Sequence, residues 1–365
     1  MEEGKKKGKN IKISIVISVA LSLSIILLIL YFTIDSNTIN QIRNAKIRYE
    51  FFALAILLNI IYWCLWGARL KVISNTVDEN VKISFFESTK IVIANLFLAG
   101  ITPSMAGGEP VRIYLLNKDG HNLGSATGIV LGERLFDAIY ILSILPIAIF
   151  IFKDVTDIGF LTAGLLIGVV FFIILLILFI YSIIKPEKTK SFLLYLNKKL
   201  QRFRKDKTKG NLVIERINSE VDNFSNSIKG FSGKNKKAFI KIIILTMLFW
   251  TAGFLIPSMI LIGLGLPPFF IESYAAQVLL LVIIMMPTTP GSSGVAEIGV
   301  YGLYGAMIGT TSESLIGVFI LLYRFISYHM NLIAGGIFQY KIFRSFSNIS
   351  MDTIKKTDHT NKDEK

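Results

Sequence analysis

Cysteine and histidine are scarce in this chain. Its 365 residues include one cysteine, Cys64, and three histidines, His121, His329 and His359. A lone cysteine cannot form a disulfide or a thiolate metal site within one chain, and three scattered histidines are too few for a metal cluster. The sequence therefore predicts neither a metal site nor a bound cofactor.

Several signatures of soluble enzymes are also missing. The chain has no P-loop, no nucleophile elbow, no zinc-protease motif and no dinucleotide-binding fingerprint. Its longest polar stretch, residues 185–237, is too short for a large soluble domain. We therefore expect no direct coupling to nucleotide hydrolysis within this chain, and any chemistry must take place among its membrane segments.

Long apolar runs, in contrast, dominate the chain, which is 53% hydrophobic. A helix needs about 20 apolar residues to cross a bilayer. Seven runs approach or exceed that length: Ile13–Phe32, Phe51–Trp66, Leu135–Phe152, Gly159–Ile184, Ile242–Leu264, Phe270–Met286 and Leu315–Phe338. We predict an all-α polytopic membrane protein with about seven to nine transmembrane helices. The first run follows several lysines but is too long for a signal-peptide core, so we expect an uncleaved span.

The net charge of +14 is distributed in a way that argues against nucleic-acid binding. Lys185–Lys237 carries 15 Lys and Arg residues against five acids, directly beside two apolar runs. Basic loops next to spans stay in the cytoplasm, so we expect this loop and both basic termini there, with the chain in the cell membrane. The predicted organisation is a basic N-terminus (1–12), a first membrane half (13–184), a basic amphipathic loop (185–240), a second membrane half (241–340) and a disordered tail (341–365).

Part of the basic loop has helical periodicity. Phe192, Leu196, Leu200 and Phe203 recur at helical spacing among lysines and arginines. This pattern is typical of an amphipathic helix that lies on an anionic membrane surface. Apolar residues between 214 and 231 also recur every three or four positions, which indicates either a helix lying on the protein or membrane or a partner-binding helix.

One motif interrupts the apolar sequence twice. The first copy begins at Thr102-Pro103 and the second at Thr289-Pro290, and each has a glycine four residues after its proline and a glutamate soon after. Irregular backbone at membrane depth survives only where it is buried in protein or lines a wet cavity. Paired interruptions in the two halves of a chain often mark the substrate site of a transporter.

Short apolar segments adjoin the two breaks. Asn95–Ile101 precedes the first break and Val295–Ile308 follows the second. Both are shorter than a full span, which suggests re-entrant segments. The pairing suggests an inverted repeat, although two Thr-Pro dipeptides can also coincide by chance.

Gly107, Gly108 and Glu109 are candidate substrate-binding residues at the first break, with Arg112 in the following turn. Pro110 suits the first position of a new helix, whose free amides would attract an anion such as a lipid phosphate. Glu109 would repel phosphate unless it were paired with Arg112, protonated or facing a cationic headgroup. It could also simply cap the helix.

Gly291, Gly294 and Glu297 are the matching candidates at the second break. If Gly294 caps the following helix, Glu297 lies at its third position and can reach back to the cap amide. A capping role and a substrate-binding role are both open for Glu297.

Glu133, Arg134 and Asp137 are candidates at the start of a long apolar run. Glu133 and Asp137 lie four residues apart and share one face of a helix. A charge at the bilayer centre costs about 2.5–3.5 kcal/mol on insertion scales, so these side chains should be paired, near an interface or lining water. An ion pair that only fixes helix packing and a role in binding or proton coupling are both open.

Tyr323 and Arg324 are the candidates in the last apolar run, where Arg324 is the most isolated membrane charge. Its guanidinium group could hold a lipid headgroup or could satisfy Glu297 or Asp137. Arg69, in contrast, follows shortly after the second apolar run, and we expect it to be a snorkelling anchor at the interface.

Together these motifs resemble the flippase-like proteins of the lysylphosphatidylglycerol synthase transmembrane-region family. The matching pieces are Asn95…Thr102-Pro103-x-x-x-Gly107-Gly108-Glu109-Pro110-x-Arg112, Gly132-Glu133-Arg134-x-x-Asp137, Pro287-x-x-Pro290-Gly291-x-x-Gly294-x-x-Glu297 and Tyr323-Arg324. The resemblance implies an all-helical membrane domain with re-entrant segments, which in some relatives moves phospholipid between leaflets. Relatives that make modified lipids carry a separate aminoacyl-transferase or glycosyltransferase domain, and neither fits into this chain. Ser292-Ser293 departs from the more glycine-rich stretch that the family pattern leads us to expect.

Three function classes remain open. The first is a translocase that moves a phospholipid or a lipid-linked headgroup through a polar intramembrane cavity, and it is favoured because the sequence shows no activated nucleophile. The second is a membrane enzyme that acts on a phospholipid or polyprenyl-phosphate headgroup, with Glu109 or Asp137 as general base. The third is a partner protein that recruits a separate glycosyltransferase or aminoacyl-transferase through the basic loop.

Overall fold

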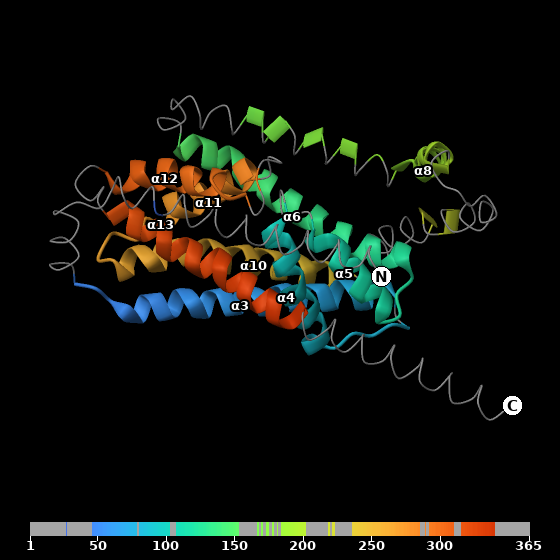
Figure 1. The fold of residues 1–365 in the computed structure, drawn as a ribbon, viewed down its shortest axis with the longest axis horizontal. Coiled ribbons are helices and arrows are strands. Elements are labelled where there is room, and N and C mark those ends of the chain that lie inside the picture. The colour runs from blue at the N-terminus through green and yellow to red at the C-terminus, as the bar shows by residue number, and fades with distance from the viewer. Residues whose placement is uncertain are drawn as a thin grey trace, which may run out of the picture.

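The computed structural model describes residues 46–78, 80–102, 107–152, 184–201, 236–284, 292–309 and 315–339, with a few single residues and pairs elsewhere. Several expected elements lie mostly outside this described part: the first span, the run from 159 to 184 and the apolar pattern between 214 and 231. The tail after 340 lies wholly outside it. All regular elements within it are helices (Figure 1). The prediction of an all-α polytopic membrane protein is confirmed.

Four helices of the described part are long and apolar enough to cross a membrane: α3 (Tyr49–Val77), α6 (Leu123–Ile151), α10 (Lys236–Gly263) and the last span (Ile316–Gln339). The last span contains α13 (Ile316–Arg324) and a π-helical turn, η2 (Phe325–His329). Four shorter helices pack among them: α4 (Phe85–Ile101), α5 (Gly108–Lys118), α11 (Phe270–Ile284) and α12 (Val295–Ile308). Each short helix covers at most about 25 Å, which is less than the roughly 30 Å of the hydrocarbon layer.

The long helices α3 and α10 lie side by side and run antiparallel (Figure 1). The backbone amide of Arg48, just before α3, donates to the carbonyl of Gly263, at the end of α10, over 3.0 Å. Toward the opposite ends, Arg69 Nη1 lies 3.3 Å from Thr246 Oγ1. The two halves of the chain therefore meet along helices of opposite direction.

Helices α4 and α5 form a re-entrant hairpin around the first break. A Cβ added at Gly108, where α5 begins, would lie 2.5 Å from the side-chain oxygen of Asn95 in α4. A Cβ added at Gly120, just after α5, would lie 3.6 Å from Val81, just before α4. The chain therefore returns to the side from which it entered, as expected for a re-entrant segment.

Helices α11 and α12 form a second hairpin around the second break. A Cβ added at Gly299 in α12 would lie 2.8 Å from Leu280 in α11. Farther from the break, the hydroxyls of Tyr304 and Ser273 lie 2.9 Å apart. α12 therefore runs back along α11, and both breaks carry the predicted re-entrant segments.

Each hairpin packs against the span of the other half. Gly335 of the last span lies so close to α4 that an added Cβ would be 2.4 Å from the backbone nitrogen of Phe97. In the same way α11 packs on α6, where the Tyr140 and Tyr274 hydroxyls form a hydrogen bond. Each half thus contributes a long helix, a broken hairpin and a span, and the two long helices run in opposite directions. This is the arrangement of an inverted repeat.

Helix α8 (Pro186–Gln201) is the longest described part of the basic loop, and it is drawn apart from the other labelled helices in Figure 1. Lys190 pairs with Glu187 over 3.0 Å and with Asp222 over 2.8 Å. Phe192 is exposed. The helix predicted from the periodicity of this segment is present, and its contact with a membrane surface stays a prediction.

Candidate functional site

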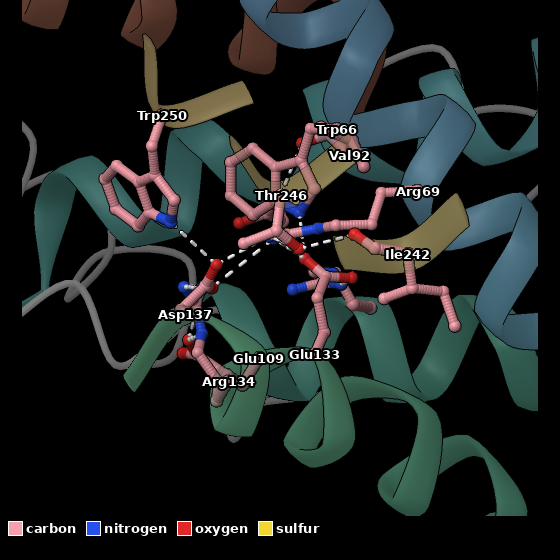
Figure 2. A network of polar contacts seen from close by, with 12 residues as sticks. Trp66, Arg69, Val92, Glu109, Glu133, Arg134, Asp137, Ile242, Thr246 and Trp250 are labelled. Carbon is pink, nitrogen blue, oxygen red and sulfur yellow. Dashed lines mark hydrogen bonds and ion pairs between the residues drawn. The ribbon is translucent and has the colours of Figure 1, made fainter. Parts of the chain in front are cut away.

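Six charged side chains gather where α3, α5 and α6 meet (Figure 2). Three arginines face three carboxylates: Arg69 of α3, Glu109 and Arg112 of α5, and Glu133, Arg134 and Asp137 of α6. We call these six residues the charged network. Its formal charges sum to zero, which limits the cost of placing ions in a medium of low dielectric constant.

Arg69 lies at the centre of the charged network and bridges two carboxylates. Its Nη2 lies 2.6 Å from Glu133 Oε1, and its Nη1 lies 2.5 Å from Asp137 Oδ1. The spacing of four places both carboxylates on one face of α6, where the two arms of a planar guanidinium group can reach them. The side chains of Arg69 and Glu133 are fully buried, and that of Asp137 is 8% exposed. Pairing therefore replaces the hydration that these ions have lost.

The position of Arg69 corrects the expectation that it anchors α3 at the interface. Its Cα lies only about 12 Å from the end of α3 at Val77, a distance over which a long side chain can often reach the surface. Sequence position alone therefore does not separate a snorkelling arginine from a buried one. One feature of the sequence could have indicated that Arg69 is buried: Trp66 lies three residues earlier and places an indole N–H donor on the same face of the helix.

Arg112 holds the second oxygen of Glu133. Its Nη2 lies 2.5 Å from Glu133 Oε2, and both side chains are fully buried. Arg112 therefore does not pair with Glu109, which was one of the alternatives for that carboxylate. Within the described part of the chain, Nε and Nη1 of Arg112 have no hydrogen-bond partner. A buried guanidinium group with two unused donor atoms can donate hydrogen bonds to a further ligand oxygen, such as that of a phosphate.

Glu109 and Arg134 form the accessible end of the charged network. Arg134 Nη2 lies 2.8 Å from Glu109 Oε1, and Arg134 Nη1 lies 3.2 Å from Asp137 Oδ2. The side chain of Arg134 is 37% exposed and that of Glu109 is 24% exposed, against 8% or less for the other four residues. Exposure therefore falls along the network from Arg134 toward Arg69.

Neutral donors complete the surroundings of the two central carboxylates (Figure 2). The indole N–H of Trp66 donates to Glu133, and that of Trp250 donates to Asp137 over 2.9 Å. Trp250 and Thr246 belong to α10, so the second half of the chain closes a site built by the first half. Sequence analysis missed these residues because a tryptophan or threonine in an apolar helix is most often only a packing residue.

Gly107 and Gly108 allow close packing at the first break. The amide of Gly107 donates to Thr102 Oγ1 over 2.8 Å, and a Cβ at Gly107 would lie 2.6 Å from the same side chain. Helix α5 begins at Gly108, so Pro110 occupies its third position rather than the expected first. Proline is tolerated there because amides in the first turn have no partner within the helix. Glu109 lies in this first turn, beside the break.

A second Glu–Arg pair lies at the second break. Glu297 Oε2 accepts a hydrogen bond from the Gly294 amide over 2.6 Å, and Glu297 Oε1 lies 2.9 Å from Arg324 Nε. Glu297 therefore caps α12, and Arg324 meets Glu297 rather than Asp137. The pair is buried, with side-chain exposures of 0% and 5%. Gly294 and Ser292 have φ angles of +91° and +52°, so a serine adopts here the backbone region that favours the expected glycine.

Arg324 directly precedes the π-helical turn η2. Such turns occur often at functional sites. Asn59 of α3 stabilises this one by donating to the carbonyl of Ile326 over 3.0 Å. The guanidinium carbon of Arg324 lies 4.1 Å from the centre of the Tyr328 ring, and the Tyr328 hydroxyl donates to the carbonyl of Gly100 over 3.0 Å. The second pair is thereby connected to the end of α4, at the first break.

Tyr323 belongs to a separate chain of hydrogen bonds. Its hydroxyl donates to Gln277 Oε1 over 2.8 Å, and Gln277 Nε2 donates to the Tyr304 hydroxyl over 2.9 Å. These bonds connect the last span to both arms of the second hairpin. The substrate contact predicted for Tyr323 stays a prediction.

The Glu109–Arg134 and Glu297–Arg324 pairs occupy equivalent places in the two halves. Each glutamate lies in the first turn of the short helix after a break, and each arginine lies in the span that follows. Their N–O distances are 2.8 Å and 2.9 Å. The two pairs differ in exposure, because the first is accessible and the second is buried. One conformation thus contains an exposed copy and a buried copy of the same ion pair.

The predicted site residues therefore separate into two groups. Gly107 and Gly108 border the charged network, which contains the other five candidates of the first half. Glu297 and Arg324 form the second pair, and Gly294 is the N-cap residue of α12, beside Glu297. Gly291 lies outside the described residues. Their contact with a substrate stays a prediction.

Comparison with known proteins identifies the family. The family described as lysylphosphatidylglycerol synthase TM region matches residues 15–335, a range that contains both breaks. An Archaeoglobus fulgidus protein named UPF0104 membrane protein is 34% identical over 287 residues, which cover 78% of this chain and 84% of the relative. A Methanothermobacter thermautotrophicus protein of the same name is 40% identical over 68 residues, 19% of each chain. No solved structure matches the chain. The chain belongs to the lysylphosphatidylglycerol synthase TM-region family.

Proposed function

We propose that this protein moves a phospholipid or a lipid-linked headgroup between the leaflets of a membrane. Family membership supports a lipid-related membrane role. The observation that carries the proposal is the charged network, in which six ions lie among membrane helices and exposure falls from one end to the other. Ions at such positions are expensive and usually functional. A translocase needs them to line a polar path for the headgroup while the acyl chains remain in lipid.

Exchange of ion-pair partners would let a headgroup enter the charged network. A phosphate that approaches the accessible end meets Arg134 first. Farther in, Nε and Nη1 of the fully buried Arg112 have no hydrogen-bond partner among the described residues. Guanidinium groups bind phosphate and carboxylate with the same planar fork. A phosphate can therefore replace carboxylate contacts one at a time, and no arginine is left without an anion.

The second pair gives the proposed path its other end. In inverted-repeat transporters the two halves move against each other around one site. We assign the present structure to a state in which the Glu109–Arg134 pair is exposed and the Glu297–Arg324 pair is buried, and we propose a second state with the exposures reversed. In that second state Gly294 and Tyr323 would border the headgroup.

The proposed setting is the cell membrane, with both termini and the basic loop in the cytoplasm. The positive-inside rule supports this orientation, because the loop between the two membrane halves is rich in lysine and arginine and adjoins apolar segments. The exposed Phe192 on α8 supports contact with an anionic membrane surface. A separate glycosyltransferase or aminoacyl-transferase is a proposed partner, by resemblance to relatives that carry such domains.

Lipid movement in vesicles that contain the purified protein tests this function. Arg134→Gln removes the accessible guanidinium group, and we expect about tenfold slower movement, since hydrogen bonds to charged groups contribute about 1.5–3 kcal/mol. Arg48→Gln is the matched control, because Arg48 forms an exposed pair with Glu50 over 3.0 Å outside the charged network. Equal rates in these two variants would contradict the assignment of the path.

A further inference from the structure

We infer that the last span bends at the π-helical turn η2, and that this bend is the movement that separates Glu297 from Arg324. The inference rests on the proposed function and names the part of the protein that moves in it. It starts from one juxtaposition: the irregular turn Phe325–His329 begins directly after Arg324, inside a membrane-spanning helix. Sharp bends of helices often lie at such turns.

The part of the last span before η2 is attached to the second hairpin. The Tyr323 hydroxyl donates to Gln277 Oε1 of α11 over 2.8 Å. Arg324 Nε lies 2.9 Å from Glu297 Oε1 of α12. Contacts to both arms of the second hairpin therefore hold α13, and the two should move as one body.

The part of the last span beyond this point is attached to the first hairpin. The Tyr328 hydroxyl, near the end of η2, donates to the carbonyl of Gly100 in α4 over 3.0 Å. A Cβ added at Gly335 would lie 2.4 Å from the backbone nitrogen of Phe97, which also belongs to α4. Different hairpins therefore hold the two ends of the last span. When the hairpins move relative to each other, the span must change shape between Arg324 and Tyr328.

Side-chain donors lower the free-energy cost of a bend at η2. A bend lengthens backbone hydrogen bonds, and a carbonyl without a partner inside a membrane is strongly unfavourable. Four carbonyls in or beside η2 accept a hydrogen bond from a side chain: Tyr323 from Ser327 Oγ, Arg324 from His329 Nδ1, Ile326 from Asn59 Nδ2 and Ser327 from Asn331 Nδ2, over 2.6, 3.1, 3.0 and 2.6 Å. These carbonyls keep a partner when the backbone bonds lengthen.

The equivalent span of the other half has a regular backbone at this place. Arg134 and Arg324 belong to the two equivalent ion pairs, and Asp137 and Ser327 each follow three residues later. Helix α6 is α-helical from Leu123 to Ile151, whereas the last span changes to a π-helical turn after its arginine. The irregular turn therefore lies in the span whose ion pair is buried and has to separate.

Distances between spin labels on introduced cysteines test the inference. Cys64→Ser removes the one natural cysteine, so each labelled protein carries two nitroxides at chosen positions. Leu321 and Ile337 are exposed on opposite sides of η2. Phe86 on α4 and Ile271 on α11 are exposed markers of the first and the second hairpin. The four distances from the two markers to the two positions are measured in vesicles of phosphatidylethanolamine and phosphatidylglycerol.

Glu297→Gln shifts the protein toward the proposed second state. It leaves the buried Arg324 without an anion, which favours the state in which this arginine is exposed. A bend of about 20° displaces a point about 9 Å from the turn by about 3 Å and a point about 15 Å away by about 5 Å. These lengths correspond to the helix from Ser327 back to Leu321 and on to Ile337.

A bend predicts that only two of the four distances differ between the native protein and Glu297→Gln. Phe86–Leu321 and Ile271–Ile337 cross the turn and should change by about 3–5 Å. Phe86–Ile337 and Ile271–Leu321 each stay within one body and should keep their native values. The two constant distances also show that the variant is folded.

Two further variants complete the design. Glu50→Gln is the matched control and should keep all four distances, since Glu50 belongs to the exposed pair with Arg48. Should Glu297→Gln fail to fold, Arg324→Gln breaks the same ion pair from its other side and should give the same pattern of distances.

The pattern of distances separates a bend from other movements. A last span that moves as a straight rod would change Phe86–Ile337 together with Phe86–Leu321, and this result would overturn the inference. Four unchanged distances would also overturn it, and lipid movement by the same native protein would then leave translocation standing. No movement of lipid by the native protein would overturn the proposed function itself.

Discussion

Replacing Arg69 with methionine tests the charge balance of the network. Arg69 is fully buried and holds Glu133 and Asp137 at 2.6 Å and 2.5 Å. Its loss leaves two cations facing three carboxylates. Removing one partner of a buried ion pair costs about 3–5 kcal/mol, because the remaining charge is not compensated. We expect the free energy of unfolding to fall by about this amount in Arg69→Met.

Neutralising Asp137 in the same protein should recover part of this loss. With Arg69→Met and Asp137→Asn combined, Arg112 still pairs with Glu133 and Arg134 still pairs with Glu109. The network is then neutral again, as two separate pairs. We expect the double variant to be more stable than Arg69→Met by about 2 kcal/mol, since replacing buried ions by neutral groups is often close to neutral.

Tryptophan fluorescence during unfolding in mixed micelles measures both effects. Trp66 and Trp250 are two of the three tryptophans, and both donate to carboxylates of the network. Arg48→Met removes an exposed cation at the opposite end of α3 and serves as the control, with an expected change below about 1 kcal/mol. A similarly small loss in Arg69→Met, or a further loss on adding Asp137→Asn, would refute the account of a balanced network.

Three further predictions concern other parts of the structure. Gly335→Ala should destabilise the protein by about 1–3 kcal/mol in the same assay, because its Cβ would lie 2.4 Å from the backbone of Phe97. Gly305→Ala should not, because no atom of the described residues lies within 4 Å of its added Cβ. Burial lowers the pKa of His121 below its ordinary value of 6.5, so the unfolded chain takes up the proton at higher pH than the folded protein does. The free energy of unfolding should therefore decline as pH falls below 6.5. If the decline persists in His121→Gln, another group causes it. Glu297→Gln should slow lipid movement in vesicles although the Glu297 side chain is 0% exposed, because the proposed path needs both ion pairs to separate in turn. A native rate in this variant would contradict the two-state path.

Much of the fold follows from the sequence. The Gly/Pro breaks and the short apolar segments predicted the two hairpins, because broken backbone inside a membrane needs protein around it. Helices α3, α6 and α10 are longer than the apolar runs that predicted them. For example, α6 begins at Leu123, twelve residues before the run at Leu135, because polar residues can continue a helix inside protein. The direction of the repeat could not be read from the sequence, since it depends on how α3 and α10 pack.

The candidate site was predicted in part. The charges of the Glu133-Arg134-x-x-Asp137 motif were identified because ions in an apolar run need partners. Their actual partners depend on three-dimensional packing, and so Glu109 binds Arg134 rather than its neighbour Arg112. Arg69 was misjudged because distance from the helix end does not determine which way a side chain points.

The most direct test of lipid translocation uses the native protein in vesicles with lipid labelled on an acyl chain. A quencher that cannot cross the membrane reaches only the outer leaflet when no translocase is present. The account predicts that the accessible fraction rises well above this one-leaflet level in vesicles with the native protein. An accessible fraction that stays at the one-leaflet level for both zwitterionic and anionic lipids would contradict it.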